Sequence, residues 1–246
     1  MGAICCDSRF NAENAGMLRD LEPPSISTND QLERWELSQP FARATIMAYM
    51  HCLNLAHQAS GDNGYVMLEH LSAQFNTPAW NALRKSESKF SKFLMTSLKH
   101  ESGKGVDYEM MVCMGILHCQ DKAKPTTKAN ALYELLQDGG AEKQTHICSS
   151  DKDWKPITAK LFTAATIAAN DGCDTTFYDP SDCDKFKASF AEVAGMDEEE
   201  NSLIDDLFGV DSKKSYEQYI EQMSTAGRRW FSAKDIRKRV HDVSGV

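Results

Sequence analysis

The sequence lacks an apolar run of the ~20 residues that a membrane-spanning helix needs, and its start lacks the charged-then-apolar pattern of a signal peptide. It also lacks an excess of basic over acidic residues, because the formal net charge is −9. Proteins that bind nucleic acid present a basic footprint to the phosphates. We therefore expect a protein that stays in the cytosol and has no nucleic-acid partner.

Motifs of enzymes and of structural zinc are absent as well. The sequence has no phosphate-binding glycine loop, no Gly-x-Ser-x-Gly, no His-Glu-x-x-His and no dinucleotide-binding fingerprint. We predict that the protein is not an enzyme, with a helical active site assembled in space as the alternative. None of the eight cysteines forms a CxxC pair, and Cys52, Cys113 and Cys119 lie in apolar surroundings. This is typical of buried free thiols in a reducing compartment.

Helical patterns account for most of the remaining sequence. Hydrophobic residues make up 41% and charged residues 26%, which is enough for a sizeable core. Residues 41–57 are apolar on nearly every side, as in a buried helix. One helix face is predicted from the spacing of Phe90, Phe93, Leu94 and Leu98, and further helices at 110–117, 128–136, 152–169, 182–195, 197–208 and 216–226. Alternating patterns are rare, so the predicted fold class is all-α.

The first six residues, Met1-Gly2-Ala3-Ile4-Cys5-Cys6, carry a candidate lipid anchor. Loss of Met1 would expose Gly2 for myristoylation, with Cys6 standing where the usual pattern has Ser or Thr. One myristoyl chain binds a membrane only marginally, and palmitate on Cys5 and Cys6 would supply the second signal that stable anchoring needs. We predict a flexible, acylated tail over residues 1–28, at the cytoplasmic face of a plasma or ciliary membrane. The alternative is an unmodified tail that happens to begin in this way.

A short pattern recurs at the start of three predicted helices: glycine or polar residues, an aliphatic residue, then a polar, aromatic and acidic group. It occurs at 64–71, 105–111 and 214–219, with Val66 and Val106 in the aliphatic position of the first two. The pattern resembles the second half of an EF-hand loop, where the aliphatic residue pairs one loop with another. The chain thus resembles the EF-hand superfamily, and especially its N-terminally acylated calcium sensors, the neuronal calcium sensors and the flagellar calflagins.

The resemblance implies two EF-hand-like lobes behind the tail, at residues 29–120 and 128–226. A linker at 121–127 would join them, and a basic segment at 227–246 would follow. This basic segment could contact anionic lipid, dock Trp230 and Phe231 in the protein's own groove, or pack on the core as a surface helix. A helical bundle with ordinary polar turns is the alternative to the EF-hand arrangement.

The aligned loops lack the ligands that calcium needs. Calcium takes 6–8 oxygens, from acidic or other oxygen-bearing side chains at loop positions 1, 3 and 5 and a bidentate glutamate at position 12. The four loops run Ala59–His70, Lys99–Met110, Gly140–Asp151 and Leu207–Gln218. None has suitable residues at both ends, so none should bind calcium tightly. The weak ligand candidates are Asp62, Asn63, Glu69, Asp211 and Glu217, and calcium is the one cofactor left open.

Two details of the last two loops complete the alignment. Ile147 and Lys214 take the aliphatic position of the third and fourth loops. Ser215 and Gln218, at positions 9 and 12 of the fourth loop, predict a capping box at the start of its exit helix.

Together these features favour a membrane-tethered, EF-hand-like adaptor or signalling regulator that offers an apolar groove to a partner helix. The 11 methionines suit such an adaptable surface. One alternative is a genuine calcium sensor or buffer with non-consensus ligands, and another is an enzyme with an unrecognised helical site. The likeness to calflagins adds a third, a structural component of a cilium or of the cytoskeleton.

Overall fold

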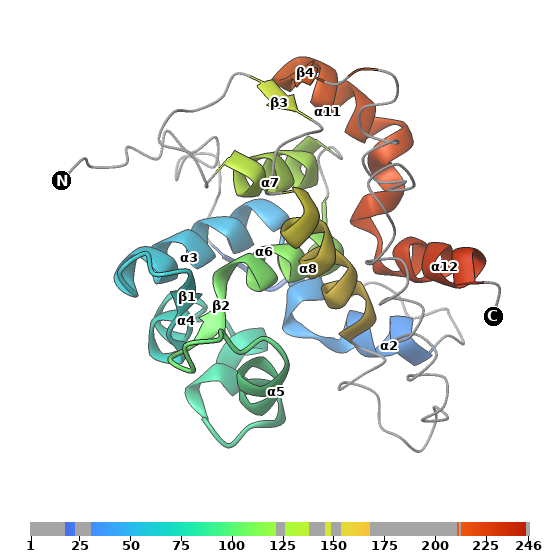
Figure 1. Cartoon of the computed structure of the whole chain (residues 1–246). Coiled ribbons are helices and arrows are strands. Elements are labelled where there is room, and N and C mark those ends of the chain that lie inside the picture. The colour runs from blue at the N-terminus through green and yellow to red at the C-terminus, as the bar shows by residue number, and fades with distance from the viewer. Residues whose placement is uncertain are drawn as a thin grey trace.

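The structure is a computed structural model that describes residues 18–22, 31–121, 126–137, 146–148, 154–167, 211 and 213–244. Helices make up most of this part of the chain (Figure 1), which confirms the all-α class. The α-helices are α2 (Gln31–Ser38), α3 (Ile46–Ala59), α4 (Leu68–Gln74), α5 (Lys89–Ser97), α6 (Tyr108–His118), α7 (Thr126–Gln137), α8 (Trp154–Ile167), α11 (Tyr216–Ser224) and α12 (Ala233–Ser244). The 3₁₀ helices are η1 (Pro40–Arg43), η2 (Pro78–Arg84) and η5 (Ala226–Phe231), and the strands are β1 (Tyr65–Val66), β2 (Val106–Asp107), β3 (His146–Cys148) and β4 (Lys213–Ser215).

The helices predicted in the described residues are present, with one break. The stretch predicted as one helix over 41–57 divides into η1 and α3, because Thr45 is extended and its side chain accepts a hydrogen bond from the backbone N–H of Ala48. This cap starts α3 afresh. The helices predicted at 182–195 and 197–208 lie outside the described residues.

The first group of helices, α3 to α6, is organised by β1 and β2. These two strands pair antiparallel, with Tyr65 opposite Asp107 and Val66 opposite Val106. An aromatic cluster belongs to the core of this group, and Phe41 contacts three of its other rings. The ring of Phe41 packs against those of Tyr49, Trp80 and Phe90 at centroid distances of 5.3–5.9 Å. Phe41 precedes α3, so residues outside the helix pairs complete the core of this group.

Helix α6 is buried on all sides and packs directly on α3. Gly115 makes this close contact, because a Cβ atom there would lie 2.3 Å from Cε1 of Tyr49. The hydroxyl of the same tyrosine donates a hydrogen bond of 2.8 Å to the carbonyl oxygen of Met111. One tyrosine therefore uses both its ring and its hydroxyl to fix α3 against α6.

The second group consists of α7, α8 and α11 with the strands β3 and β4. The strands pair antiparallel, with Ile147 opposite Lys214. Helix α11 packs on α7, where the buried hydroxyl of Tyr219 donates 3.0 Å to the carbonyl oxygen of Ala129. Helix α8 packs on α6 of the first group. Helix α7 begins at Thr126, so the linker predicted at 121–127 ends earlier than expected.

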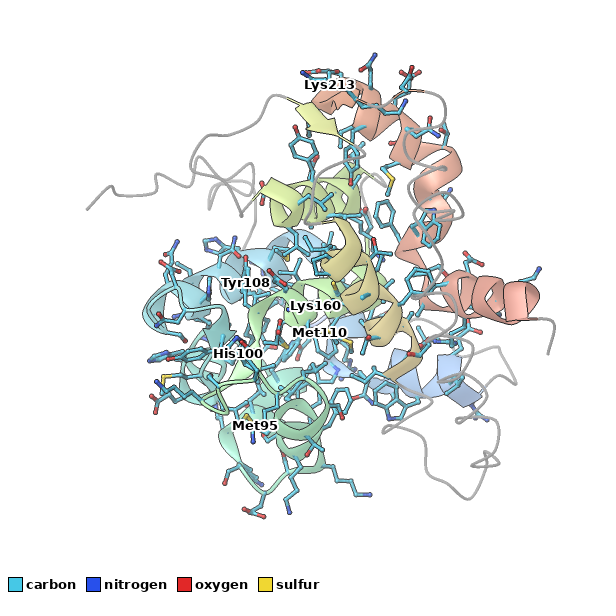
Figure 2. The ribbon with its side chains drawn as sticks, viewed as in Figure 1. Met95, His100, Tyr108, Met110, Lys160 and Lys213 are labelled. Atoms are coloured by element: carbon cyan, nitrogen blue, oxygen red, sulfur yellow. The ribbon has the colours of Figure 1, made fainter. Side chains whose placement is uncertain are left out.

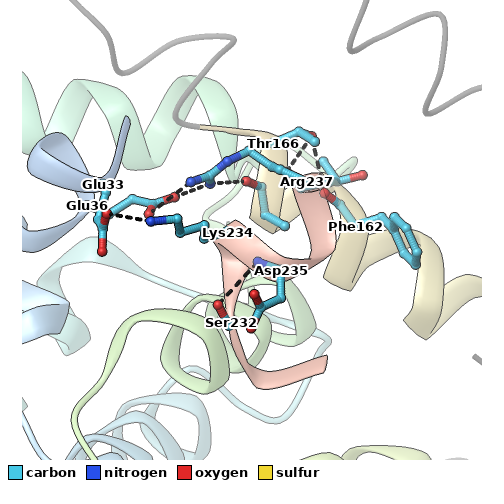
Figure 3. A network of polar contacts seen from close by, with 10 residues as sticks. Glu33, Glu36, Phe162, Thr166, Ser232, Lys234, Asp235 and Arg237 are labelled. Atoms are coloured by element: carbon cyan, nitrogen blue, oxygen red, sulfur yellow. Dashed lines mark hydrogen bonds and ion pairs between the residues drawn. The ribbon is translucent and has the colours of Figure 1, made fainter. Parts of the chain in front are cut away.

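The C-terminal segment packs on the core. Trp230 and Phe231 are buried, and the ring of Trp230 lies 5.8 Å from that of Phe162 on α8. Arg237 on α12 is 5% exposed and forms a bidentate ion pair with Glu36 on α2, which is 7% exposed. Its guanidinium also donates 2.8 Å to the carbonyl oxygen of Ala165 on α8 (Figure 3). One arginine thus joins α2, α8 and α12, and this segment packs on the protein's own helices, as two of the three sequence-based alternatives expected.

Five residues of the predicted flexible tail are docked. Leu18 is buried, and the backbone N–H of Leu21 donates 2.8 Å to the carbonyl oxygen of Arg43. The carboxylate of Asp20 accepts hydrogen bonds from the Thr77 hydroxyl at 2.6 Å and the Ala79 N–H at 2.8 Å. Asp20 therefore caps η2 from a distant part of the chain. The prediction of a free tail to residue 28 is wrong for Leu18–Glu22.

The buried pair of Arg237 and Glu36 predicts a large effect of its disruption. Arg237→Leu leaves the Glu36 carboxylate buried without its counter-charge, and we expect unfolding free energy to fall by about 3–5 kcal/mol. The matched control is Lys234→Met on the same helix, which removes an exposed ion pair of 3.2 Å with Glu33 and should cost less than about 1 kcal/mol. Urea denaturation measures both, and equal losses would contradict the assignment of Arg237 as the structural joint.

Candidate functional site

Hydrogen bonds of one serine join the two ends of the first loop. The hydroxyl of Ser60 donates 2.8 Å to the carbonyl oxygen of Ala56 and accepts 3.0 Å from the N–H of Met67. It also lies 2.9 Å from Nδ1 of His70. Because its one proton is used on Ala56, Nδ1 of His70 carries the proton and donates. Ser60 thus joins the start of the loop to His70 at position 12.

The three ligand candidates of this loop point to different partners. Oδ1 of Asp62, which has a φ of 52°, lies 3.3 Å from Nδ1 of His57. Nδ2 of Asn63 donates 3.4 Å to the carbonyl oxygen of Ser60. The carboxylate of Glu69 is 70% exposed and 3.9 Å from Nε2 of His70. The loop therefore does not bring the three together.

The second loop is closed by its own backbone. The N–H of Asp107 donates 2.7 Å to Leu98, and that of His100 donates 2.9 Å to Gly105. Lys99 and Val106 form an antiparallel bridge, and Gly103 makes the turn with a φ of 74°. These hydrogen bonds run between the two sides of the turn, so the start of the second loop forms a small hairpin. They also occupy the carbonyl oxygens of Leu98 and Gly105.

The carboxylates at the end of the second loop bind an ammonium group. Nζ of Lys160 on α8 lies 2.8 Å from Oδ2 of Asp107 and 2.7 Å from Oε2 of Glu109. Figure 2 shows Lys160 beside the first turn of α6, where Tyr108 and Met110 are labelled. Burial acts to lower the pKa of Lys160, but the hydrogen bonds to Asp107 and Glu109 outweigh it and raise that pKa. Lys160 therefore stays charged and joins α8 to the second loop.

The fourth loop confirms one prediction and separates two ligand candidates. Ser215 and Gln218 form the predicted capping box, with hydrogen bonds of 3.3 Å and 2.8 Å. Oδ2 of Asp211 lies 3.2 Å from Nζ of Lys214, and Oε2 of Glu217 accepts 3.0 Å from the hydroxyl of Ser215. Across the part of the chain that the structure describes, no three His, Cys, Asp or Glu side chains form a group able to hold a metal ion.

A repeated polar contact links the first and last helix of each group. The hydroxyl of Tyr108 on α6 donates 2.9 Å to Oδ1 of Asn54 on α3. In the second group the hydroxyl of Tyr216 on α11 donates to Oδ1 of Asn130 on α7. Three residues after each asparagine an aromatic ring contacts the same tyrosine, His57 at 4.0 Å and Tyr133 at 5.0 Å. The sequence did not predict this pair of tyrosine–asparagine hydrogen bonds. The one local signal is that each tyrosine lies two residues after the residue of its loop that pairs with the other loop.

A small cavity of about 190 Å³ lies between α2, the end of α6 and the C-terminal segment. It is lined by Glu33, Glu36, Leu37, Leu117, His118, Phe231, Ser232, Ala233 and Lys234. Burial lowers the pKa of His118 to about 3, and the positive charges of Arg237 and Lys128 act in the same direction. The ring has a hydrogen bond to the backbone of Ala164, while its Nε2 is buried without a partner. His118 is therefore a neutral, structural histidine.

The three cysteines of the core match the prediction of buried free thiols. Burial raises the pKa of the Cys52 thiol to about 11 and raises those of Cys113 and Cys119 further. Burial therefore disfavours the thiolate, which is the reactive form, at each of the three.

The predicted lipid-attachment residues Gly2, Cys5 and Cys6 lie outside the described residues. In the described part, no helix is both long and apolar enough to cross a bilayer. The chain matches no family model, no curated protein and no solved structure. The interpretation of its function therefore depends on the geometry of its own residues.

The Ser60 contacts predict a loss of stability when the hydroxyl is removed. Ser60→Ala leaves the Met67 N–H and the His70 ring without their acceptor, and we expect a loss of about 1–3 kcal/mol in unfolding free energy. Ser72→Ala on α4, the helix that carries His70, removes a hydroxyl that donates 2.9 Å to the carbonyl oxygen of Glu69 at the surface, and should change stability by less than about 0.5 kcal/mol. Chemical denaturation separates the two, and a silent Ser60→Ala would refute the closing role of Ser60.

The lowered pKa of His118 predicts a dependence of stability on pH. Below pH 6.5 the unfolded chain takes up a proton that the folded chain accepts only near pH 3, so stability falls as pH falls through this window. The slope from this residue is at most about 1.4 kcal/mol per pH unit. His118→Gln should flatten the curve of unfolding free energy between pH 6 and about 4. His100→Gln in the second loop controls for the loss of one imidazole, and an unchanged slope in His118→Gln would contradict the assignment.

Proposed function

We propose that the protein is a membrane-tethered, EF-hand-like adaptor or signalling regulator whose fold does not depend on calcium. It acts at the cytoplasmic face of a membrane and binds a helical segment of a protein partner. The observation that carries the proposal is the pairing of loops at the positions that the EF-hand alignment gives as loop partners.

Loop pairing supports two EF-hand-like lobes. Val66 lies opposite Val106, and Ile147 lies opposite Lys214. All four residues occupy the aliphatic position of the aligned loops, and a bundle with ordinary polar turns gives no reason for pairing there. The repeated contacts of Tyr108 with Asn54 and of Tyr216 with Asn130 add a second likeness between the two groups.

Independence from calcium is supported by the closure of the loops. Calcium in an EF-hand draws the exit helix toward the loop through a carboxylate at position 12. Here Ser60 and His70 join the ends of the first loop, and Lys160 neutralises Asp107 and Glu109 beside the second. The groups that make these contacts belong to the chain, so the closed conformation of the two loops does not require a bound ion.

The partner site lies where the C-terminal segment now packs. Among the described residues, Leu55 is the one large apolar side chain that is exposed, at 38%, so the other large apolar side chains are already covered by the chain itself. Trp230 and Phe231 of η5 are buried against the second group. A partner helix with a comparable pair of aromatic anchors would take their place. In the absence of a partner, Trp230 and Phe231 of the chain itself thus occupy the proposed partner site.

The tether is assigned to Gly2, Cys5 and Cys6, with myristate and palmitate as the two lipid signals. The docking of Leu18 and Asp20 fixes where this tail joins the body, beside η2. The genuine calcium sensor or buffer, the enzyme with a helical site and the ciliary or cytoskeletal component stay as alternatives that the following experiment and activity assays separate.

Membrane fractionation of cells that express the chain tests the tether and the calcium independence together. We expect wild type in the membrane fraction with calcium or with a chelator, and Gly2→Ala or the pair Cys5→Ser and Cys6→Ser in the soluble fraction. Lys213→Ala, an exposed lysine of β4, is the control that keeps wild-type partition.

A calorimetric titration of the non-acylated protein, with magnesium present, completes the test. We expect no binding heat up to millimolar calcium. Saturable binding in the micromolar range, or a partition that changes with calcium, would favour the calcium sensor. A membrane fraction unaffected by the Gly2 and cysteine substitutions would refute the lipid tether.

A further inference from the structure

The exposed side chains around α5 carry a net positive charge, opposite in sign to that of the whole chain. Residues 84–104 hold six cations and two carboxylates, which leaves four net positive charges in a chain of net charge −9. All eight are exposed: Arg84, Lys85, Glu87, Lys89, Lys92, Lys99, Glu101 and Lys104. We call the exposed residues of this segment the α5 surface. It runs from the end of η2 across α5 to the second loop.

The fold directs these cations away from the core. Phe90 and Leu94 bury one side of α5, and Lys89 and Lys92 lie one turn apart on the other. Beyond the helix, the side chain of Lys99 lies over Gly103, with Cε 3.5 Å from the position that a Cβ would take there. Among the six cations, all of which the structure describes, Lys92 alone has an ion-pair partner, Glu87 at 2.8 Å. The others are free to meet an external anion.

The tail joins the body next to this surface. Asp20 caps η2 at Thr77 and Ala79, and Arg84 ends the same 3₁₀ helix seven residues after Thr77. At about 2 Å per residue, η2 spans about 14 Å. Gly2 precedes Leu18 by 16 residues, which reach at most about 55 Å when fully extended. An acyl group on Gly2 and the α5 surface can therefore reach the same plane.

We propose that the α5 surface is the face that the protein turns toward an anionic bilayer. This inference rests on the proposed membrane tether and adds its orientation and its lipid preference. Cytoplasmic leaflets carry anionic lipids that attract basic residues near the surface. A chain of net charge −9 is repelled by such a leaflet in most orientations, and an orientation that presents the α5 surface lowers this repulsion.

The composition of the α5 surface fits lipid headgroups better than a single bound phosphate group. Five of the six cations are lysines, which are compact charges on flexible stems and suit a diffuse layer of anions. A site for one phosphate uses the planar fork of arginine in a fixed geometry. On the other basic helix, α12, Arg237 pairs with Glu36 and Lys234 with Glu33, which leaves Lys238 as its exposed lysine without an ion pair among the described residues.

Vesicle sedimentation of the purified, non-acylated full chain tests the proposal. The probes are vesicles of phosphatidylcholine alone and vesicles with about one third phosphatidylserine, at low salt. We expect binding to the anionic vesicles only, weakened by added salt. Lys89→Glu with Lys92→Glu should lower the partition coefficient at least about tenfold, since each charge near the surface is worth about fivefold.

The matched control reverses two exposed lysines elsewhere, Lys213→Glu with Lys238→Glu, and changes the net charge by the same amount. It should bind within about threefold of wild type. Equal losses in the two variants would show that net charge and not this face decides binding, and would overturn the proposal. So would the absence of binding to anionic vesicles, which is the result expected if the partner of the α5 surface is an acidic protein.

Failure of the tether is a separate result. The protein in this assay carries no lipid, so the vesicle data do not depend on acylation at Gly2, Cys5 or Cys6. If the chain proves to be unmodified in cells, the lipid tether falls while a loss confined to the α5 variant still supports the bilayer-facing surface. Circular dichroism and thermal melting of both variants confirm that they are folded.

Discussion

The pairing of loops is the constraint on which the rest of the fold depends. Two short ladders, Val66 with Val106 and Ile147 with Lys214, hold the starts of the exit helices together in each group. Helices α6 and α11 begin directly after β2 and β4. In the first group this geometry places Gly115 of α6 against Tyr49 of α3, where a larger residue has no room. The core is therefore arranged around a few backbone hydrogen bonds at one edge.

The ends and the carboxylates of the first two loops contact other groups of the chain itself. The chain supplies a hydroxyl and an imidazole at Ser60 and His70, backbone hydrogen bonds within the second loop, and the ammonium of Lys160 for Asp107 and Glu109. The ammonium comes from the second group of helices, so neutralisation of one loop also fixes the two groups together. Because Lys160 belongs to the chain, this link between the two groups does not depend on a bound ion.

Sequence patterns predicted the local features well and the long-range ones poorly. Apolar periodicity located α5, α6 and α8, and the loop alignment placed Val66, Val106 and the capping box of Ser215 and Gln218 at the positions where they function. These signals are contained in a few neighbouring residues. The pair of Arg237 and Glu36, separated by 201 residues, leaves no local signal, because the basic run around Arg237 looks the same whether it faces water or the core. Asp20 was missed for the same reason, since it caps a helix that begins 58 residues later.

The paired contacts of Tyr108 with Asn54 and of Tyr216 with Asn130 close the two groups of helices in the same way. Each is followed on the first helix by an aromatic residue three positions on, His57 in one group and Tyr133 in the other. Asn54 lies 12 residues before Val66, the paired residue of the first strand, and Asn130 lies 17 residues before Ile147. Each tyrosine lies two residues after the paired residue of the second strand, Val106 or Lys214. All four side chains are half-buried. In both groups, therefore, a tyrosine at the start of the last helix is tied to an asparagine of the first by one hydrogen bond at the edge of the core, although the number of residues between the asparagine and its strand differs.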